Sequence, residues 1–243
     1  MTTTSPRLAG RLALVTGATR GIGRAVALAY AKEGAHLILV GRTAGALEEV
    51  DDEIRSLGGN ATLLTLDLKQ HDKIDALGPT IYQRWNKLDI LVGNAGVLGP
   101  LSPLGHITAE AWNEVMEVNI TANWRLIRTL DPLLRRSDAG RAIFVTSGVA
   151  SNPRAYWGPY AVSKAALEAL ARIYAQEMEN TPVRVNLINP GPTHTAMRSK
   201  AFPGEKPETL KRPEDHVETF IALAEPGCRE NGRLFDLKTG KVR

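Results

Sequence analysis

The stretch RLALVTGATRGIG, residues 11–23, joins a short apolar run to a glycine-rich turn. The apolar run is typical of a buried strand, and a segment with helical periodicity follows the turn. Gly17, Gly21 and Gly23 let the backbone turn sharply and approach an anionic group at the first turn of that helix. The spacing is G-x-x-x-G-x-G instead of the commoner G-x-G-x-x-G. In this strand–turn–helix context the turn indicates dinucleotide binding, against the simpler interpretation of a tight connection.

The same alternation of short apolar runs and helical segments continues along the chain. Strands are predicted at 11–17, 36–41, 61–68, 88–96, 141–148, 183–191 and 232–237. Helices are predicted from Arg24 to about Glu33 and at 44–59, 110–136 and 160–179. Apolar strands in this pattern are typical of a parallel sheet covered by helices on both faces. We therefore expect one α/β domain over residues 1–243, with a single doubly wound parallel sheet of the Rossmann type. Prolines and a glycine predict a structureless substrate lid at about 192–216.

The composition excludes several classes of protein. Apolar residues make up 43% of the 243 residues, which is enough for one good core. No run approaches eighteen apolar residues and the N-terminus lacks a signal-peptide pattern, so we expect a cytoplasmic protein that does not enter a membrane. Cys228 is the only cysteine, and no metal site is predicted. The net charge of +4 is dispersed without a nucleic-acid-binding motif, so no nucleic-acid partner is expected.

The residues after the second predicted strand indicate which dinucleotide the turn binds. An acidic side chain there would bind the adenosine ribose of NAD. This chain has Gly41 followed by Arg42, and Arg20 lies inside the glycine turn. Two guanidinium groups and no carboxylate favour the 2′-phosphate of NADP, through charge-assisted hydrogen bonds. The alternative is that both arginines simply point to solvent. NADP is thus predicted in preference to NAD.

Polar residues also close the next two predicted strands. Asp67 closes the third, and Asn94, Ala95 and Gly96 close the fourth. Each of these taken singly is a common turn residue. Because a doubly wound sheet binds its ligands across the carboxyl ends of its strands, we expect all of them at one crevice.

Tyr160 and Lys164 lie one helical turn apart in the stretch YAVSK. Side chains at this spacing share a helix face. An ammonium ~4.5 Å from the phenol, at an effective dielectric of ~20, would stabilise the phenolate by roughly 3–4 kcal/mol. Such an interaction would lower the pKa of the tyrosine by ~2–3 units, toward the range of a useful acid and base. On spacing alone, an ordinary amphipathic helix explains the pair equally well.

Six motifs in order resemble those of the short-chain dehydrogenase/reductase family. They are TGATRGIG, the NAG of GNAG, the VN of MEVNIT, the Ser of VTSG, YAVSK and PGPTHT. Ser147 lies thirteen residues before Tyr160, which is the spacing in the family. The resemblance extends from about residue 8 to residue 237.

The resemblance implies roles for individual residues. Tyr160 would be the general acid or base at the substrate oxygen, and Lys164 would lower its pKa and bind the nicotinamide ribose. Ser147 would polarise the substrate carbonyl, and Asn119 would position a water in the proton relay. The implied cofactor-binding residues are Gly17, Thr19, Arg20, Gly21, Ile22, Gly23, Asp67, Leu68, Asn94, Ala95, Gly96, Pro190, Gly191, Thr193 and Thr195, joined by Arg42 from the argument above.

The function expected is hydride transfer between NADP(H) and a carbonyl or alcohol substrate. One alternative is reduction of a 3-oxoacyl group on an acidic carrier protein, and another is a binding module that senses NADPH without turnover. The complete Asn119, Ser147, Tyr160 and Lys164 set speaks against a sensor. The resemblance also implies a homodimer or homotetramer formed through the helices at 110–136 and 160–179.

Three features depart from the usual pattern of the family. Gly93 replaces an asparagine, which we expect to loosen a backbone contact. The lid is short, and DLKTG (236–240) replaces an Asp-Gly-Gly turn, so the substrate and the subunit interface are not carried over from the family. The substrate-pocket wall is predicted to comprise Leu98, Tyr156, Trp157, His194 and Met197, with Arg198 or Lys200 as candidates for a substrate carboxylate.

Overall fold

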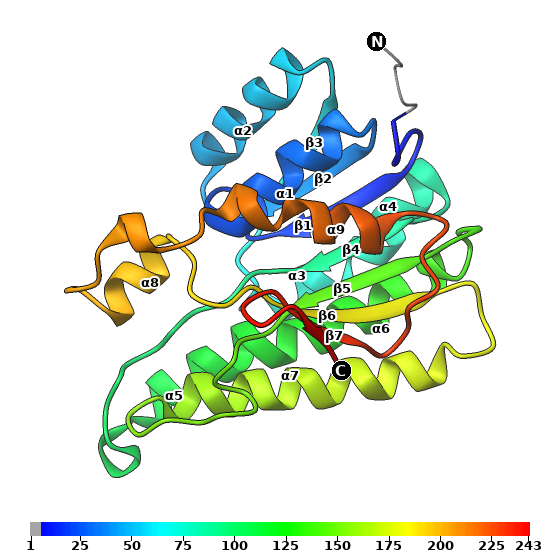
Figure 1. The fold of residues 1–243 in the computed structure, drawn as a ribbon. Coiled ribbons are helices and arrows are strands. Elements are labelled where there is room, and N and C mark those ends of the chain that lie inside the picture. The colour runs from blue at the N-terminus through cyan, green and yellow to red at the C-terminus, as the bar shows by residue number, and fades with distance from the viewer. Residues whose placement is uncertain (1–5) are drawn as a thin grey trace.

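An eight-stranded sheet forms the centre of the computed structural model, which describes residues 6–243 (Figure 1). The strand order is β3-β2-β1-β4-β5-β6-β7-β8, parallel throughout except for the antiparallel pair β7–β8. The strands are β1 (Leu12–Thr16), β2 (His36–Gly41), β3 (Asn60–Thr65), β4 (Ile90–Gly93), β5 (Arg141–Val145), β6 (Arg184–Asn189), β7 (Leu234–Asp236) and β8 (Lys241–Val242). The order reverses between β1 and β4, which is the switch point of a doubly wound sheet.

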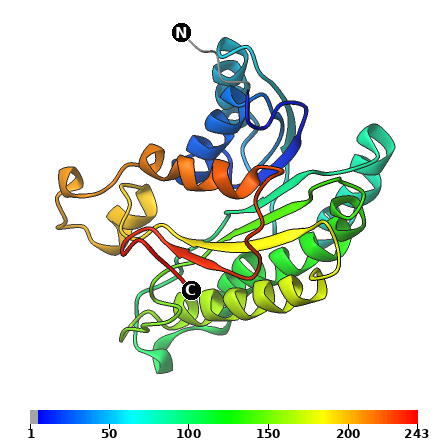
Figure 2. The ribbon, with the colours of Figure 1, turned by 45° about the vertical axis from the view of Figure 1, so that its right-hand side comes forward.

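Helices cover both faces of the sheet (Figures 1 and 2). One face carries α1 (Gly21–Lys32), α2 (Ala44–Ser56) and α9 (Val217–Ala224). The other carries α3 (His71–Asp75), α4 (Leu77–Trp85), α6 (Ala122–Leu134) and α7 (Gly158–Glu177). This three-layer arrangement confirms the predicted Rossmann-type fold. No helix within residues 6–243 has the length and apolarity needed to cross a membrane.

The alternation of side chains along β1 divides the core into two layers. Leu12 and Leu14 pack with the cluster that includes α6 and α7, whereas Ala13 and Val15 pack with α1 and α9. Successive side chains of a strand point to opposite faces of the sheet. A strand covered on both faces therefore needs apolar residues at every position, which explains the uninterrupted run in the sequence.

The seven predicted strands occupy the predicted places, but all except β2 end earlier at their carboxyl ends. The predicted strand 61–68 ends at Thr65, and 88–96 ends at Gly93. The residues beyond these ends leave the sheet and form the loops at its carboxyl edge. DLKTG forms the turn between β7 and β8, where the Asp236 carboxylate accepts hydrogen bonds from the backbone of Lys238 and Thr239, both at 3.1 Å. The sequence did not predict β8.

The long helix predicted at 110–136 is continuous but not uniform. It begins as α5 (Ala109–Met116), widens into a π-helical segment (Glu117–Thr121), and continues as α6. The Thr108 hydroxyl caps α5 by accepting a hydrogen bond from Ala111 N. Single π-helical turns occur frequently at functional sites. Here the turn contains Asn119.

The prediction that 192–216 lacks structure is wrong. The segment contains α8 (Ala196–Ala201) and the 3-10 turns η3 (Pro207–Thr209) and η4 (Pro213–His216). The Thr195 hydroxyl accepts a hydrogen bond from Arg198 N and caps α8. The prolines at 207 and 213 each occupy the first position of a turn, where a missing N–H costs nothing. The segment projects from the carboxyl edge of the sheet (Figure 1).

Candidate active site

The glycine turn between β1 and α1 has a conformation and a packing that only glycine allows. Gly17 and Gly21 have φ of +64° and +55°, in the left-handed region. A Cβ atom on Gly23 would lie 2.3 Å from the carbonyl oxygen of Gly17 and 2.4 Å from Nδ2 of Asn94. No side chain caps the start of α1, whose first turn also contains no acidic residue. The turn thus leaves the positive end of a helix open to an anion.

Thr16 and Asn94 join the glycine turn to the end of β4. The Thr16 hydroxyl accepts hydrogen bonds from the backbone N–H groups of Asn94 and Ala95, both at 3.1 Å. The Asn94 amide donates to the carbonyl oxygens of Thr16 (2.9 Å) and Gly17 (3.3 Å). Asn94 therefore fixes the shape of the turn through its side chain. Thr16 was not among the predicted site residues, although its position before Gly17 marks the end of β1.

The segment after β6 lies against the same turn. A Cβ on Gly21 would be 3.3 Å from the methyl group of Thr195, and Gly191 has a φ of +73°. A Cβ on Gly96 would be 3.3 Å from Oδ1 of Asn119 and 3.5 Å from Nζ of Lys164. Segments 16–23, 94–96 and 190–195, which are distant in sequence, thus meet at the carboxyl edge of the sheet, as predicted.

The two arginines predicted to favour NADP are available for a ligand. Arg20 is the N-cap residue of α1, and Arg42 follows Gly41 at the end of β2. A Cβ on Gly41 would be 2.7 Å from the methyl group of Thr19, so the end of β2 touches the glycine turn. Both arginines are exposed, and neither forms an ion pair within residues 6–243. Asp67 and Leu68 follow the neighbouring strand β3.

Asn119 is fully buried and held by three hydrogen bonds. Its Oδ1 accepts from Val97 N at 2.8 Å, and its Nδ2 donates to Val97 O and Ser163 Oγ, both at 2.9 Å. The Ser163 hydroxyl in turn donates to the carbonyl oxygen of Tyr160 at 2.8 Å. Ser163, which the sequence analysis did not single out, connects the π-helical turn to α7.

Tyr160 and Lys164 lie together beneath the loops of this edge, both buried. Nζ of Lys164 donates to the carbonyl oxygen of Val145 at 2.7 Å and lies 5.8 Å from the centre of the Tyr160 ring. Burial raises the pKa of Tyr160 to about 12, which a hydrogen bond with the partly exposed Ser147 partly opposes. Burial also lowers the pKa of Lys164 to about 8.

The predicted lowering of the tyrosine pKa is therefore wrong for this structure. The prediction considered only the charge of the lysine, but the low-dielectric surroundings disfavour the charged form of both groups. In consequence, near neutral pH the tyrosine is protonated and the lysine carries its charge.

Gly93, where we expected a looser backbone contact than the asparagine of the family makes, lies in tight packing. A Cβ there would lie 2.5 Å from both Oδ1 of Asn123 and Cδ1 of Phe144. Asn123 itself is buried, and its amide donates to the carbonyl oxygen of Asn119 at 2.9 Å. The side chains of α6 and β5 fill the space, so this position accepts only glycine.

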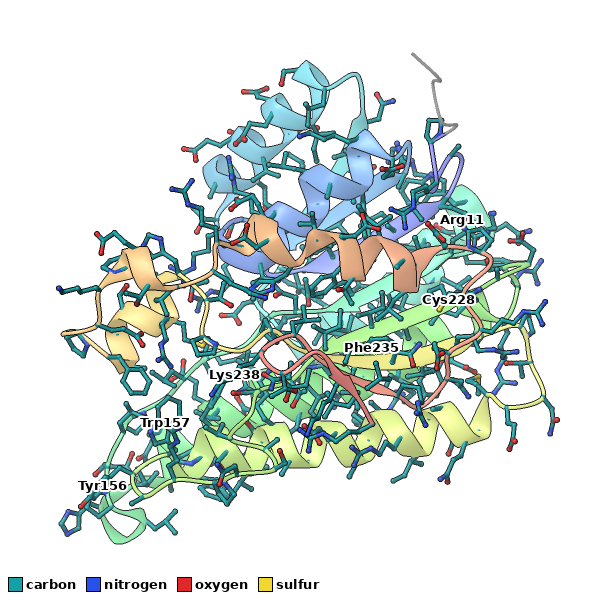
Figure 3. The ribbon with its side chains drawn as sticks, in the orientation of Figure 1. Arg11, Tyr156, Trp157, Cys228, Phe235 and Lys238 are labelled. Atoms are coloured by element: carbon teal, nitrogen blue, oxygen red, sulfur yellow. The ribbon has the colours of Figure 1, made fainter. Side chains whose placement is uncertain are left out.

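Three of the five residues predicted to wall the substrate pocket, Leu98, Trp157 and Met197, lie together beside Tyr160. Leu98, Val149, Tyr160 and Ala161 form a buried apolar cluster, against which Trp157, Met197 and Ala201 pack. Tyr156 and His194 are exposed and do not belong to it. Figure 3 shows Trp157 on the side of Tyr156 that faces the α8 segment. Phe202, whose ring centre is 5.6 Å from that of Trp157, was missed.

His216 is a further residue that the sequence analysis missed. It is buried, and its Nε2 lies 2.9 Å from the Thr193 hydroxyl, which also donates to Gly191 O. Burial lowers the pKa of His216, and the charge of Lys211 adds to this effect. A lone histidine in a proline-rich segment carries no sequence signal that would predict this contact.

Comparison with known proteins identifies the family of this chain. Residues 11–206 match the family model described as short chain dehydrogenase. The uncharacterised oxidoreductase YciK of Escherichia coli K12 is 39% identical over 235 residues, which cover 95% of this chain and 93% of that protein.

Two solved structures described as short-chain dehydrogenases have the same fold. The one from Shigella flexneri 2a, complexed with NADP, has a TM-score of 0.93 and 38% identity, and the alignment covers 97% of this chain and all of that one. The one from Escherichia coli CFT073, complexed with NADPH, has a TM-score of 0.92 and 39% identity over 97% of this chain and 99% of that one. The protein is therefore a member of the short-chain dehydrogenase/reductase family of oxidoreductases.

Proposed function

We propose that this protein interconverts a carbonyl compound and an alcohol with NADP(H), Tyr160 serving as the proton donor or acceptor. The observation that carries the proposal is the position of the Tyr160–Lys164 pair. Both residues are buried at the carboxyl edge, where Lys164 lies beside the loop that Asn94 joins to the glycine turn. The residues proposed to transfer the proton thus lie next to the residues proposed to bind the dinucleotide.

The residues of the edge fit NADP(H). The glycine turn leaves no space for a Cβ at Gly23 and directs open helix N–H groups outward, which suits a pyrophosphate. Arg20 and Arg42 would bind the 2′-phosphate. The two structural relatives crystallised with NADP or NADPH support this choice for our chain.

The remaining binding residues would surround the other parts of the cofactor. Asp67 and Leu68 would contact the adenine, and the 94–96 loop the adenosine and ribose side. Pro190, Gly191, Thr193 and Thr195 would hold the nicotinamide half. When bound, NADPH supplies the hydride that the carbonyl carbon accepts.

Tyr160 would supply the proton in the direction of reduction. At neutral pH its hydroxyl is protonated, because its pKa is about 12, and it can donate to the oxygen of a carbonyl as charge develops there. Lys164, still charged below about pH 8, would stabilise the phenolate that remains. Ser147 would hold the same substrate oxygen by a hydrogen bond.

Asn119 would help to position the water that returns the proton to Tyr160. Its side chain is fully engaged with Val97 and Ser163, which fixes the π-helical turn in place. We infer that this turn positions a water through which Lys164 and Tyr160 are reprotonated. The short segment 192–216 would close over the substrate as a lid.

A dimer or tetramer is part of the proposal. Val162 and Ile173 on α7 are 43% and 55% exposed, and Trp124 on α6 is 43% exposed. Exposed apolar side chains gathered on two long helices suit contact with a second copy. A monomer by light scattering at micromolar concentration would contradict this part of the proposal.

The test is oxidation of NADPH, with NADH in parallel, against ketones, aldehydes, quinones and 3-oxoacyl thioesters. Tyr160→Phe should lower kcat by at least about 100-fold while leaving NADPH binding intact, because only the proton donor is lost. Arg42→Ala should lower the preference for NADPH over NADH by about 10-fold or more. An unchanged preference would exclude the assignment of Arg42. Tight NADPH binding without turnover of any compound would favour the sensing module.

A further inference from the structure

We infer that the substrate is an uncharged apolar carbonyl compound. Aromatic side chains, one of them from the lid, form a wall beside Tyr160. The arginine next to this wall is paired with a glutamate of the lid, so its charge is already neutralised. The inference rests on the proposed function and names the substrate class of the same site. It is carried by the contacts among Trp157, Phe202, Arg198 and Glu205.

The wall beside Tyr160 consists of apolar and aromatic groups. The ring centre of Trp157 is 6.1 Å from that of Tyr160, with the planes at 60°, and 5.6 Å from that of Phe202. Leu98, Val149 and Ala161 are buried in the same cluster, and Met197 and Ala201 of α8 pack against it. None of these side chains carries a charge. A substrate that lies against this cluster therefore meets apolar surface beside Tyr160.

Arg198 is the cationic group next to this wall, but its guanidinium is already engaged. Its Nε and Nη2 donate to the two carboxylate oxygens of Glu205 at 2.5 and 2.6 Å. Such a bidentate pair satisfies the fork of the guanidinium that would otherwise recognise a ligand carboxylate. The guanidinium carbon also lies 3.8 Å from the centre of the Phe202 ring. Arg198 is therefore not free to bind a substrate carboxylate, contrary to the prediction from the sequence.

The backbone of the lid holds Glu205 in position for this pairing. The N–H of Glu205 donates to the carbonyl oxygen of Phe202 at 3.1 Å, and the N–H of Phe202 donates to the carbonyl oxygen of Arg198 at 2.9 Å. These two turns bring residues 198 and 205 together on one side of Phe202. The hydrogen bonds from Arg198 lower the pKa of Glu205, so its carboxylate remains ionised at neutral pH. The two side chains are 22% and 27% exposed, so solvent only partly screens the pair.

No other cation of the flanking segments replaces Arg198. Lys200, Lys206 and Arg212 of the lid and Arg154 in the loop before α7 are exposed, where water and salt weaken a contact with a ligand. Lys211 donates to the carbonyl oxygen of Leu237 at 3.2 Å. A substrate carboxylate that lies along this wall, away from Lys164, would thus have no free counter-charge, which is costly. An uncharged substrate of the same shape would avoid this desolvation cost.

The experiment compares methyl 4-formylbenzoate with 4-formylbenzoate, which differ in charge but share the ring and the reacting aldehyde. We expect kcat/KM with NADPH to be at least about 10-fold higher for the ester. Binding of each compound to the NADP-loaded protein is measured in parallel by calorimetry. Equal or better use of the carboxylate, or binding of the carboxylate as tight as that of the ester, would overturn the inference.

Glu205→Gln supplies the decisive variant, and Glu208→Gln is its control. The first substitution removes the charge that occupies Arg198, so the ratio between ester and carboxylate should fall toward one through a gain with the carboxylate. Glu208 is exposed on the same segment and has no ion pair among the described residues, so its substitution should leave the ratio unchanged. An unchanged ratio in Glu205→Gln would overturn the inference.

The two proposals fail in different ways. Preferential binding of the ester without turnover of any compound would support the apolar wall and contradict the proposed function. Turnover of other compounds that depends on Tyr160, with no preference for the ester, would contradict the wall and leave the proposed function intact.

Discussion

The ammonium nitrogen of Lys164 lies 5.8 Å from the centre of the Tyr160 ring, and both side chains are buried. Burial moves their pKa values in opposite directions, to about 12 for the tyrosine and about 8 for the lysine. As pH rises from neutrality, the lysine therefore loses its proton well before the tyrosine does. The first proton that the pair loses on going to alkaline pH is therefore that of Lys164, near pH 8.

The first prediction concerns the pH dependence of carbonyl reduction. We expect kcat/KM to decline above about pH 8, because neutral Lys164 no longer stabilises the phenolate left when Tyr160 donates its proton. Lys164→Arg should be slower but lack this decline, since a guanidinium keeps its charge throughout the range. Initial rates from pH 6 to pH 10 measure both profiles. A decline that persists in the arginine variant would assign it to another group.

The second prediction is that Lys164→Met stabilises the fold while it abolishes activity. The folded-state pKa lies below the ordinary value of 10.5, so between about pH 8 and 10.5 the unfolded chain binds a proton that the folded chain does not. The free energy of unfolding of the wild type thus rises with pH across this window. Below it the buried charge costs about 3 kcal/mol, as an order of magnitude.

Removing the ammonium also leaves the carbonyl oxygen of Val145 without its donor, which costs about 1–3 kcal/mol. We therefore expect a net gain of about 1 kcal/mol at pH 7 that turns into a net loss of about 1 kcal/mol by pH 10, measured by chemical denaturation. Lys32→Met, at an exposed lysine at the end of α1, is the control and should show little change at either pH. A gain that is independent of pH would show that the charge is not its cause.

The third prediction separates two glycines by their surroundings. Gly23→Ala should destabilise the protein by about 3 kcal/mol or more, because the new methyl group would overlap the carbonyl oxygen of Gly17. Gly45 lies in α2, and no atom lies within 4 Å of a Cβ added there. Gly45→Ala should therefore stabilise the protein by about 0.5–1 kcal/mol, because alanine loses less conformational freedom on folding than glycine. Thermal and denaturant unfolding measure both. Tolerance of alanine at 23 would disprove the packing of Asn94 against the turn.

The fourth prediction concerns His216. Its pKa in the folded protein is below the ordinary value of 6.5, because burial disfavours the charged ring. The unfolded chain therefore takes up the proton first, and the contribution of His216 to stability is lost as pH falls below 6.5. His216→Gln should reduce the loss of stability between pH 7 and pH 5, whereas His106→Gln, at an exposed site, should not. Parallel slopes for all three proteins would contradict the prediction.

The sequence predicted features that depend on residues close together in the chain. The first seven strands of the sheet, the helices α1, α2, α6 and α7 and the glycine turn lie where their patterns placed them, with differences mainly at their ends. The sequence analysis did not predict α3, α4, α9 or β8. Helix α1 begins at Gly21 instead of Arg24, because Gly21, Ile22 and Gly23 already belong to its first turn. Segment 192–216 was wrongly predicted to lack regular structure. In the sequence, a proline that begins a helical turn cannot be distinguished from a proline in an irregular loop.

The tertiary structure alone settled how the residues of the edge affect one another. The shift of the Tyr160 pKa depends on burial by several elements, which the spacing of YAVSK does not reveal. The pairing of Arg198 with Glu205 and the contact of His216 with Thr193 depend on the path of segment 192–216 along the sheet edge. Periodicity and turn chemistry act over a few residues, so they determine the elements and their order. Desolvation and side-chain pairing act through space, so only the folded chain determines the charge of each group in the site.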